Sequence, residues 1–231
     1  MKRIIRTIAA LAALSTSLVV SNSHAQVSSS AFSTGGVAQS SASGVGNVQL
    51  NASAAASGGG YANAQMTGSG LNGGRATGNA VAASNGGVAI AQGNSVANGW
   101  NARSNSNAIA ASNYGVAIAN DSARAYGNAS ANSTSGAFTT GGLAIANGSA
   151  VARGRFGGRA VANNTAISAV DYGVGIANGS AQSNAYFGGR ATSNSGAYSI
   201  GVGGFRSSGA SATSGAFFGG QSISNAFHIA P

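Results

Sequence analysis

The sequence predicts an all-β protein, a repetitive β-solenoid or β-roll of short strands, and three observations support this. One short sequence motif occurs four times, and its copies begin at Gly87, Gly115, Gly142 and Gly173. The starts are 28, 27 and 31 residues apart, a period typical of stacked repeats whose units cannot bury their own apolar face. Glycine accounts for 38 of 231 residues and proline for one, which favours β-assembly over a solvated coil.

Each copy opens with a strand-like alternation, as in Leu143-Ala144-Ile145-Ala146. Successive side chains of a strand point to opposite faces, so the two branched residues share one face and the two alanines the other. We expect the branched pairs to face the core, because β-branched side chains fit a packed sheet face. The predicted structural core is Val88, Ile90, Val116, Ile118, Leu143, Ile145, Val174 and Ile176.

A polar dipeptide follows each alternation, and Asn-Gly supplies the positive φ that tight turns need. The predicted corners are Gln92-Gly93, Asn120-Asp121, Asn147-Gly148 and Asn178-Gly179. Each copy therefore becomes a strand, a turn and a short strand, and the 27–31-residue period divides into two coils of roughly 14 residues. The corner of a solenoid and the turn of a hairpin both remain open.

Four segments are expected along the chain. Residues 1–25 have the basic start, apolar run and small-residue cleavage site (Ser23-His24-Ala25) of a secretory signal peptide, with cleavage predicted after Ala25. Residues 26–85 carry degenerate repeats, and residues 86–204 carry the regular β-repeats. Residues 205–231 are rich in aromatic side chains and form either a cap or a docking segment. The expected location is secreted, at the surface of a bacterium or outside it.

Composition argues against catalysis. After the signal peptide the chain has eight Arg, two Asp and one His, with no Glu, Cys or Lys, and hence a net charge of +6. Acid–base and nucleophilic chemistry need clustered, mutually activating groups, and metal sites need clustered ligands. We therefore expect no enzyme, no catalytic residue, no cofactor and no metal. Asp121 is expected at a turn or beside an arginine.

A second phrase places an arginine after a glycine pair, at Arg75, Arg159 and Arg190. In a stack of coils these arginines would recur on one side. They could form a basic stripe that binds an acidic surface ligand. They could instead be gatekeepers, charges that keep an assembling β-protein soluble and set its register.

The four copies resemble the head repeats of YadA-like trimeric autotransporter adhesins. The matching residues are Val88-Ala89-Ile90, Val116-Ala117-Ile118, Leu143-Ala144-Ile145 and Val174-Gly175-Ile176, followed by Gly148-Ser149-Ala150 and Gly179-Ser180-Ala181 in two copies. This resemblance implies a β-roll and surface adhesion. The composition also resembles that of curlin-like secreted amyloid subunits.

We therefore expect a secreted bacterial structural protein of the cell surface or extracellular matrix, one that self-assembles through its β-repeats into fibres or a layer. An adhesin that uses an arginine-bearing face is the alternative, and a largely disordered Gly/Ser/Asn-rich matrix protein is a further one. The expected partners are other copies of the chain and anionic polysaccharide or outer-surface components. Nucleic acid is not expected, because the charge is not clustered in the sequence.

Overall fold

The computed structural model describes residues 16–20, 25–72, 74–155, 159–187, 189–218 and 220–230, which form strands and turns without a helix. The expected signal peptide lies outside the described residues except for Thr16–Val20 and Ala25. The strands are β1 (Thr16–Val20), β2 (Ala25–Thr34), β3 (Val37–Val45), β4 (Val48–Ser57), β5 (Tyr61–Gly70), β6 (Arg75–Asn85), β7 (Val88–Gly99), β8 (Arg103–Asn113), β9 (Gly115–Gly127), β10 (Ala129–Thr139), β11 (Gly142–Gly154), β12 (Arg159–Ala185), β13 (Arg190–Ala216) and β14 (Gln221–Ile229).

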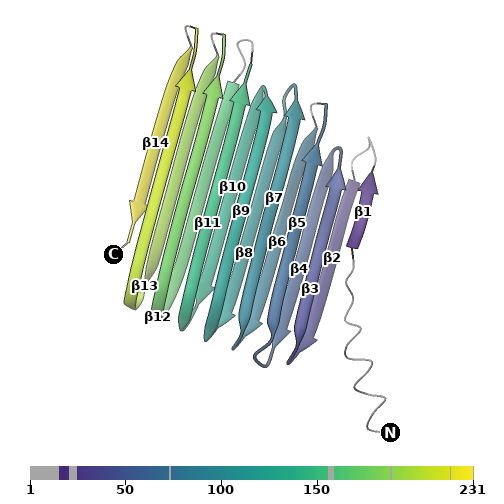
Figure 1. The fold of residues 1–231 in the computed structure, drawn as a ribbon, viewed down its shortest axis with the longest axis vertical. Helices are drawn as coiled ribbons and strands as arrows, with labels where there is room; N and C mark the ends of the chain where they lie inside the picture. Colours follow the sequence, from purple (N-terminus) through teal and green to yellow (C-terminus); the bar gives the residue numbers. More distant parts are fainter. Residues whose placement is uncertain are drawn as a thin grey trace.

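The strands form a β-solenoid of about seven turns, so the predicted all-β solenoid class is confirmed. All pairing is parallel, and each strand pairs with the strand one coil away. Strands β1, β3, β5, β7, β9 and β11, with the second halves of β12 and β13, form one layer, here called the odd layer. The remaining strands and the first halves of β12 and β13 form the even layer. Figure 1 shows the two layers as a flat slab, with turns along its upper and lower edges. This order contradicts the alternative of a largely disordered chain.

The coil is longer than predicted. Val88 pairs with Val116 and Gly142 pairs with Gly115 and Gly173, so one whole coil takes 27–31 residues in this region rather than roughly 14. The first coil is shorter, since Ala25 pairs with Val48. The predicted corners are also wrong. Strand β11 runs without a break through Asn147 and Gly148, and β7 runs through Gln92 and Gly93. In a parallel stack a strand pairs with the strand one full coil later, so these dipeptides need not be turns. The chain turns at Gly-rich or aromatic segments between the strands.

The predicted core residues lie on the outside, which is the main correction to the sequence analysis. The eight residues Val88, Ile90, Val116, Ile118, Leu143, Ile145, Val174 and Ile176 are only partly buried. The alanines between them, such as Ala89, Ala117 and Ala144, are fully buried. All buried hydrophobic residues in the described part of the chain are alanine except Val27, Val48, Leu50, Met66 and Val170.

The reason is the close approach of the two layers, which leaves room for small side chains alone. Where a large side chain does enter, the facing layer carries glycine. A Cβ on Gly44 or Gly68 would lie 3.1 Å from a methyl group of Leu50, and one on Gly78 would lie 2.6 Å from the sulfur of Met66. Side-chain size therefore decides which face of each strand turns inward.

The expected segments share one architecture. Residues 25–85, predicted to be degenerate, form coils in the same register as the rest. The boundary expected between residues 204 and 205 lies inside β13, whose second half pairs with β12. No described helix is long and apolar enough to span a membrane.

Candidate interaction surfaces

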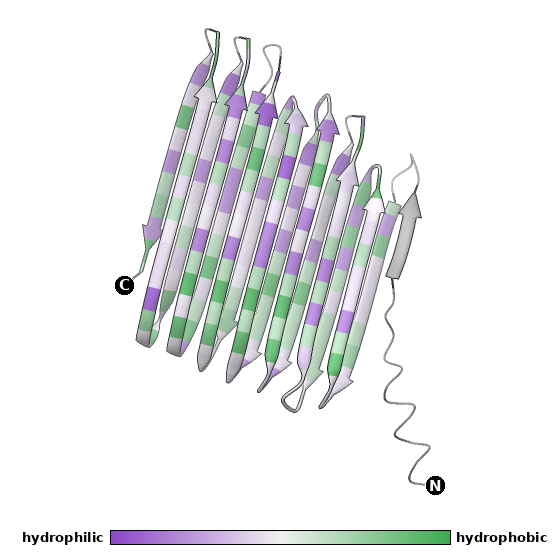
Figure 2. Cartoon of the chain, in the orientation of Figure 1, coloured by the Kyte–Doolittle hydropathy of each residue, from purple (hydrophilic) through white to green (hydrophobic). Residues whose placement is uncertain are grey.

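One continuous apolar surface is the Val/Ile strip, defined as the eight branched residues corrected above. Strand pairing places Val88, Val116, Leu143 and Val174 in one column on the outside of the odd layer. The four isoleucines form the next column, two residues further along the strands. Each side chain is partly covered by its neighbours in the column, which explains the intermediate burial. Figure 2 shows hydrophobic segments of neighbouring strands side by side towards the lower edge of the slab.

Asparagines beside this strip form a hydrogen-bonded ladder. Nδ2 of Asn147 donates to Oδ1 of Asn120 at 2.9 Å, and Nδ2 of Asn178 donates to Oδ1 of Asn147 at 3.0 Å. These asparagines were predicted to make turns. The even layer has a longer ladder from Asn105 to Asn225, with successive distances of 2.7, 2.9, 2.9 and 3.0 Å. Such ladders favour in-register stacking, because a slip of one residue breaks every rung.

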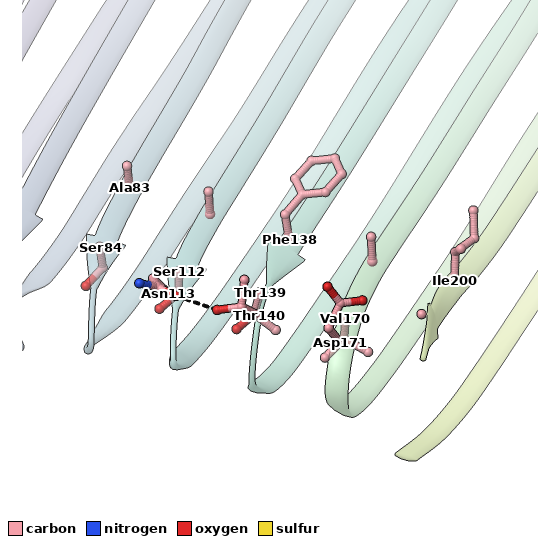
Figure 3. Close-up of a pocket in the computed structure, with 13 residues that line it drawn as sticks. Ala83, Ser84, Ser112, Asn113, Phe138, Thr139, Thr140, Val170, Asp171 and Ile200 are labelled. Atoms are coloured by element: carbon pink, nitrogen blue, oxygen red, sulfur yellow. Dashed lines mark hydrogen bonds between the residues drawn. The ribbon is translucent and has the colours of Figure 1, made fainter. Parts of the chain in front are cut away.

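The outer face of the even layer carries a shallow apolar groove of about 520 Å³ (Figure 3). Its floor is a row of alanines, including Ala83, Ala111 and Ala169, and Phe138 projects beside them. The Oγ1 of Thr140 donates to Oδ1 of Asn113 on its polar side. This face therefore combines small and aromatic residues on the same surface.

The recurring Gly-Ala-aromatic phrase has a structural role. A Cβ on Gly136 would lie 2.9 Å from the ring of Phe138, so this ring lies over the glycine two residues earlier on the same outer face. Tyr198 covers Gly196 at 3.0 Å in the same way, and Phe217 covers Gly215 at 3.2 Å. Because glycine has no side chain, each aromatic ring can lie flat against the strand.

Arginines gather along one edge, where odd strands end and even strands begin; this is the upper edge in Figure 1. Arg75 and Arg103 open β6 and β8 in register, and Arg159 and Arg190 open β12 and β13 in register. The arginine edge comprises Arg75, Arg103, Arg124, Arg153, Arg155, Arg159 and Arg190, all exposed. The three arginines singled out from the sequence thus share an edge. The other four were missed, although Arg103 follows Arg75 by the 28-residue repeat distance.

Aromatic side chains share this edge. Trp100, Phe187 and Phe218 expose 71%, 55% and 76% of their surface. Phe187 and Phe218 stack with ring centroids 5.1 Å apart, as do Tyr186 and Phe217. Both Phe187 and Phe218 have a φ of 57°, in the left-handed region, which costs roughly 1–2 kcal/mol for a non-glycine residue. The turns hold these rings outward despite that cost.

One carboxylate lies inside the slab. Asp121 is 5% exposed and sits in mid-strand, so its predicted place at a turn is wrong. Ser133 Oγ donates to its Oδ2 at 2.6 Å, the Thr134 backbone N–H donates at 2.9 Å, and Ser106 donates to Oδ1. Burial raises the pKa of Asp121 to about 6, against the opposing effect of these hydrogen bonds. Its neighbours in the column are Gly93 and Gly148, which leave space for the carboxylate.

The last coil differs from the others at its interior positions. Arg206 occupies the column that holds Gly175 and Ala144, and its guanidinium donates to the carbonyl of Gly201. His228 occupies the column of Ala197, 3.4 Å from the Oγ of Ser208. Charged or bulky groups at inward positions protect an open sheet edge from pairing with another chain.

Comparison with known proteins gives no relative: no family model, no curated protein and no solved structure matches this chain. Within the part of the chain that the structure describes, no three His, Cys, Asp or Glu side chains gather as a metal site would require. The surfaces described above therefore carry the functional argument.

Proposed function

We propose that this protein is a secreted structural protein of the bacterial cell surface or extracellular matrix, and that its copies assemble by packing slab on slab. The observation that carries the proposal is the distribution of side-chain size. The described interior is built mainly from alanine, serine and glycine, while most branched and aromatic residues lie outside. Apolar patches that stay on the outside of a folded chain commonly mark a surface that another molecule covers.

The partner that fits best is a second copy of the same chain. The Val/Ile strip is a flat array of columns whose rungs repeat at the strand spacing, about 4.8 Å. Another copy offers the same spacing, so two strips can interdigitate over their whole length as paired sheets do. The strip contains no charged residue whose burial would oppose the contact.

Each face of the slab carries an apolar patch, so association does not stop at a dimer. The odd layer presents the Val/Ile strip, and the even layer presents the alanine-floored groove beside Phe138. A particle with two adhesive faces stacks without limit. End-to-end joining is less favourable, because it would bury Arg206 and His228 between two copies.

The test is a set of surface variants. Ile90→Ser, Ile118→Ser, Ile145→Ser and Ile176→Ser together should leave the β-sheet circular dichroism intact. They should abolish the assemblies that we expect electron microscopy and light scattering to detect for the unaltered protein. The matched control replaces four outward polar residues with another small polar residue: Asn94→Ser, Ser122→Thr, Ser149→Thr and Ser180→Thr. A monomeric unaltered protein, or unchanged assembly of the isoleucine variant, would contradict the proposal.

The arginine edge favours a second candidate, a surface adhesin. Replacing Arg75, Arg159 and Arg190 with serine separates it from gatekeeping. Loss of binding to a cell surface with intact assembly supports adhesion, whereas uncontrolled aggregation supports gatekeeping. The location of the arginines favours adhesion, because they lie along the turns and not on β14, the last strand of the even layer, which pairs with β13 on one side alone.

A further inference from the structure

We infer that the arginine edge binds an extended acidic polysaccharide, with one carboxylate-bearing sugar at each of several neighbouring coils. The inference concerns the edge of the slab and does not depend on whether the faces assemble. Seven of the eight arginines in the described residues lie on this edge, although the sequence scatters them over more than a hundred positions.

Among the described residues, no acidic side chain lies on the arginine edge to neutralise its positive charge. The described residues include two acids. Asp121 is buried between the layers, and Asp171 lies at the opposite edge, where even strands end. Arg75 beside Arg103, and Arg159 beside Arg190, are like charges on directly paired positions, an arrangement that destabilises a sheet. A bound polyanion removes this repulsion and gives each guanidinium a carboxylate partner, often through two parallel hydrogen bonds.

The geometry suits a linear chain of sugars. Paired arginines are separated by one strand spacing, about 4.8 Å. A pyranose in an extended 1,4-linked polymer advances by a similar distance, so two consecutive uronic acids can meet Arg75 and Arg103, and two more can meet Arg159 and Arg190. The coil between the two pairs carries Ser130 beside Arg103. The exposed rings of Trp100, Phe187 and Phe218 border the same edge and offer apolar surface to the C–H faces of the sugars.

Single-stranded nucleic acid also combines anionic charge with flat rings, but it fits less well. Nucleobases need open aromatic faces to stack upon. Here Phe187 stacks on Phe218 and Tyr186 stacks on Phe217, at 5.1 Å in both pairs, so one face of each ring is closed to a base and the outer faces and ring edges remain for a ligand. The Tyr126 ring is occupied as well, by the guanidinium of Arg153 at 5.7 Å from its centroid.

The experiment measures binding of the full chain to polygalacturonate by biolayer interferometry at several salt concentrations. Fully methyl-esterified polygalacturonate and oligo(dT) serve as comparison probes. We expect salt-sensitive binding to the acid form and at least about tenfold weaker binding to both other probes, since about 1.4 kcal/mol corresponds to tenfold. Arg190→Ser should weaken binding to the acid form by about fivefold to tenfold. Arg206→Ser, with the same change in net charge at the opposite edge, should leave it unchanged.

Several results would overturn the inference. Equal binding of the methyl ester would remove the role of charge, and tighter binding of oligo(dT) would assign the edge to nucleic acid. Equal losses in the two arginine variants would show a general effect of net charge. Electron microscopy of the same samples without polysaccharide reports slab assembly separately, so failure of one proposal leaves the other measurable.

Discussion

Ser133 donates a 2.6 Å hydrogen bond to Asp121 from the opposite layer. Asp121 is the one charged side chain among the described buried residues between the two layers. The carboxylate is desolvated, and its pKa is raised from 3.8 to about 6. A raised pKa means that the folded state holds the proton more tightly than the unfolded state. Stability is then greatest below about pH 4 and falls as the pH rises through 6.

The first prediction follows from this relationship. The free energy of unfolding should be larger at pH 4 than at pH 7 by about 2 kcal/mol, because one pKa unit corresponds to about 1.4 kcal/mol and the unfolded carboxyl is already partly ionised at pH 4. Denaturant titrations at the two pH values measure the difference. Asp121→Asn keeps the shape and removes the titration, so its unfolding should be nearly independent of pH in this range. A variant that retains the full pH dependence would show that another group is responsible.

The second prediction concerns which side of a strand faces inward. Ala119→Ile should destabilise the protein by about 1–3 kcal/mol or more, because the interior has no space for added carbon atoms. Its neighbour Ile118 is on the outside, so Ile118→Ala should cost less, and β-structure should remain. Thermal unfolding followed by circular dichroism compares the two. If Ile118→Ala were the more destabilising of the two variants, Ile118 would face the interior and the outward placement would be wrong.

The third prediction concerns the asparagine ladder. Asn147→Ala removes the hydrogen bond donated to Asn120 and the one accepted from Asn178. At about 0.5–1.5 kcal/mol for each bond, the loss should be about 1–3 kcal/mol. Ser149→Ala, two residues further on the same outer face, is the control and should have a smaller effect. A loss no larger than that of the control would mean that the ladder adds little to stability.

The fourth prediction concerns the end of the slab. Arg206→Ala together with His228→Ala removes the two groups that occupy interior positions of the last coil. The open edge can then pair with the first coil of another copy, so thin fibrils with a cross-β spacing should appear in electron micrographs and fibre diffraction. The single variant Arg206→Lys retains the inward charge and should not form them. Fibrils already present in the unaltered protein would contradict the protective role of these residues.

The sequence was sufficient to predict a stack of repeated β-coils, because the same motif recurs every 27–31 residues. It was not sufficient to fix the length of a coil or the parallel pairing, since a hairpin and two shorter coils fitted the same period. Nor was it sufficient to orient the strands. Val88-Ala89-Ile90-Ala91 has a branched face and a small face, and alternation does not say which one is buried. That choice depends on the distance between layers, which is a property of the whole fold. The contacts of Leu50 with Gly44 and Gly68 were equally out of reach, since they join residues whose spacing in the chain follows no repeat.

The candidate surfaces were also predictable from the sequence only in part. Arg75, Arg159 and Arg190 could be placed on one side because each follows a glycine pair. Arg153 and Arg155 could not, because they do not follow a glycine pair: Arg153 lies near the end of β11, and Arg155 directly follows that strand. The buried Asp121 was assigned to a turn because Asn-Asp is common in turns. Its inward direction follows from the register with Gly93 and Gly148, which only the paired strands reveal.

Each coil contacts only the coils on either side of it, and this has a consequence for how the gene can change. Removing residues 115–141, one whole coil made of β9 and β10, would bring Gly142 and β11 to β7 with every column still aligned. Duplicating the same segment would lengthen the slab by one coil. A deletion of half that length would bring strands of one layer beside strands of the other and break the matched columns of both layers. Length variation in such a gene should therefore occur in steps of a complete coil.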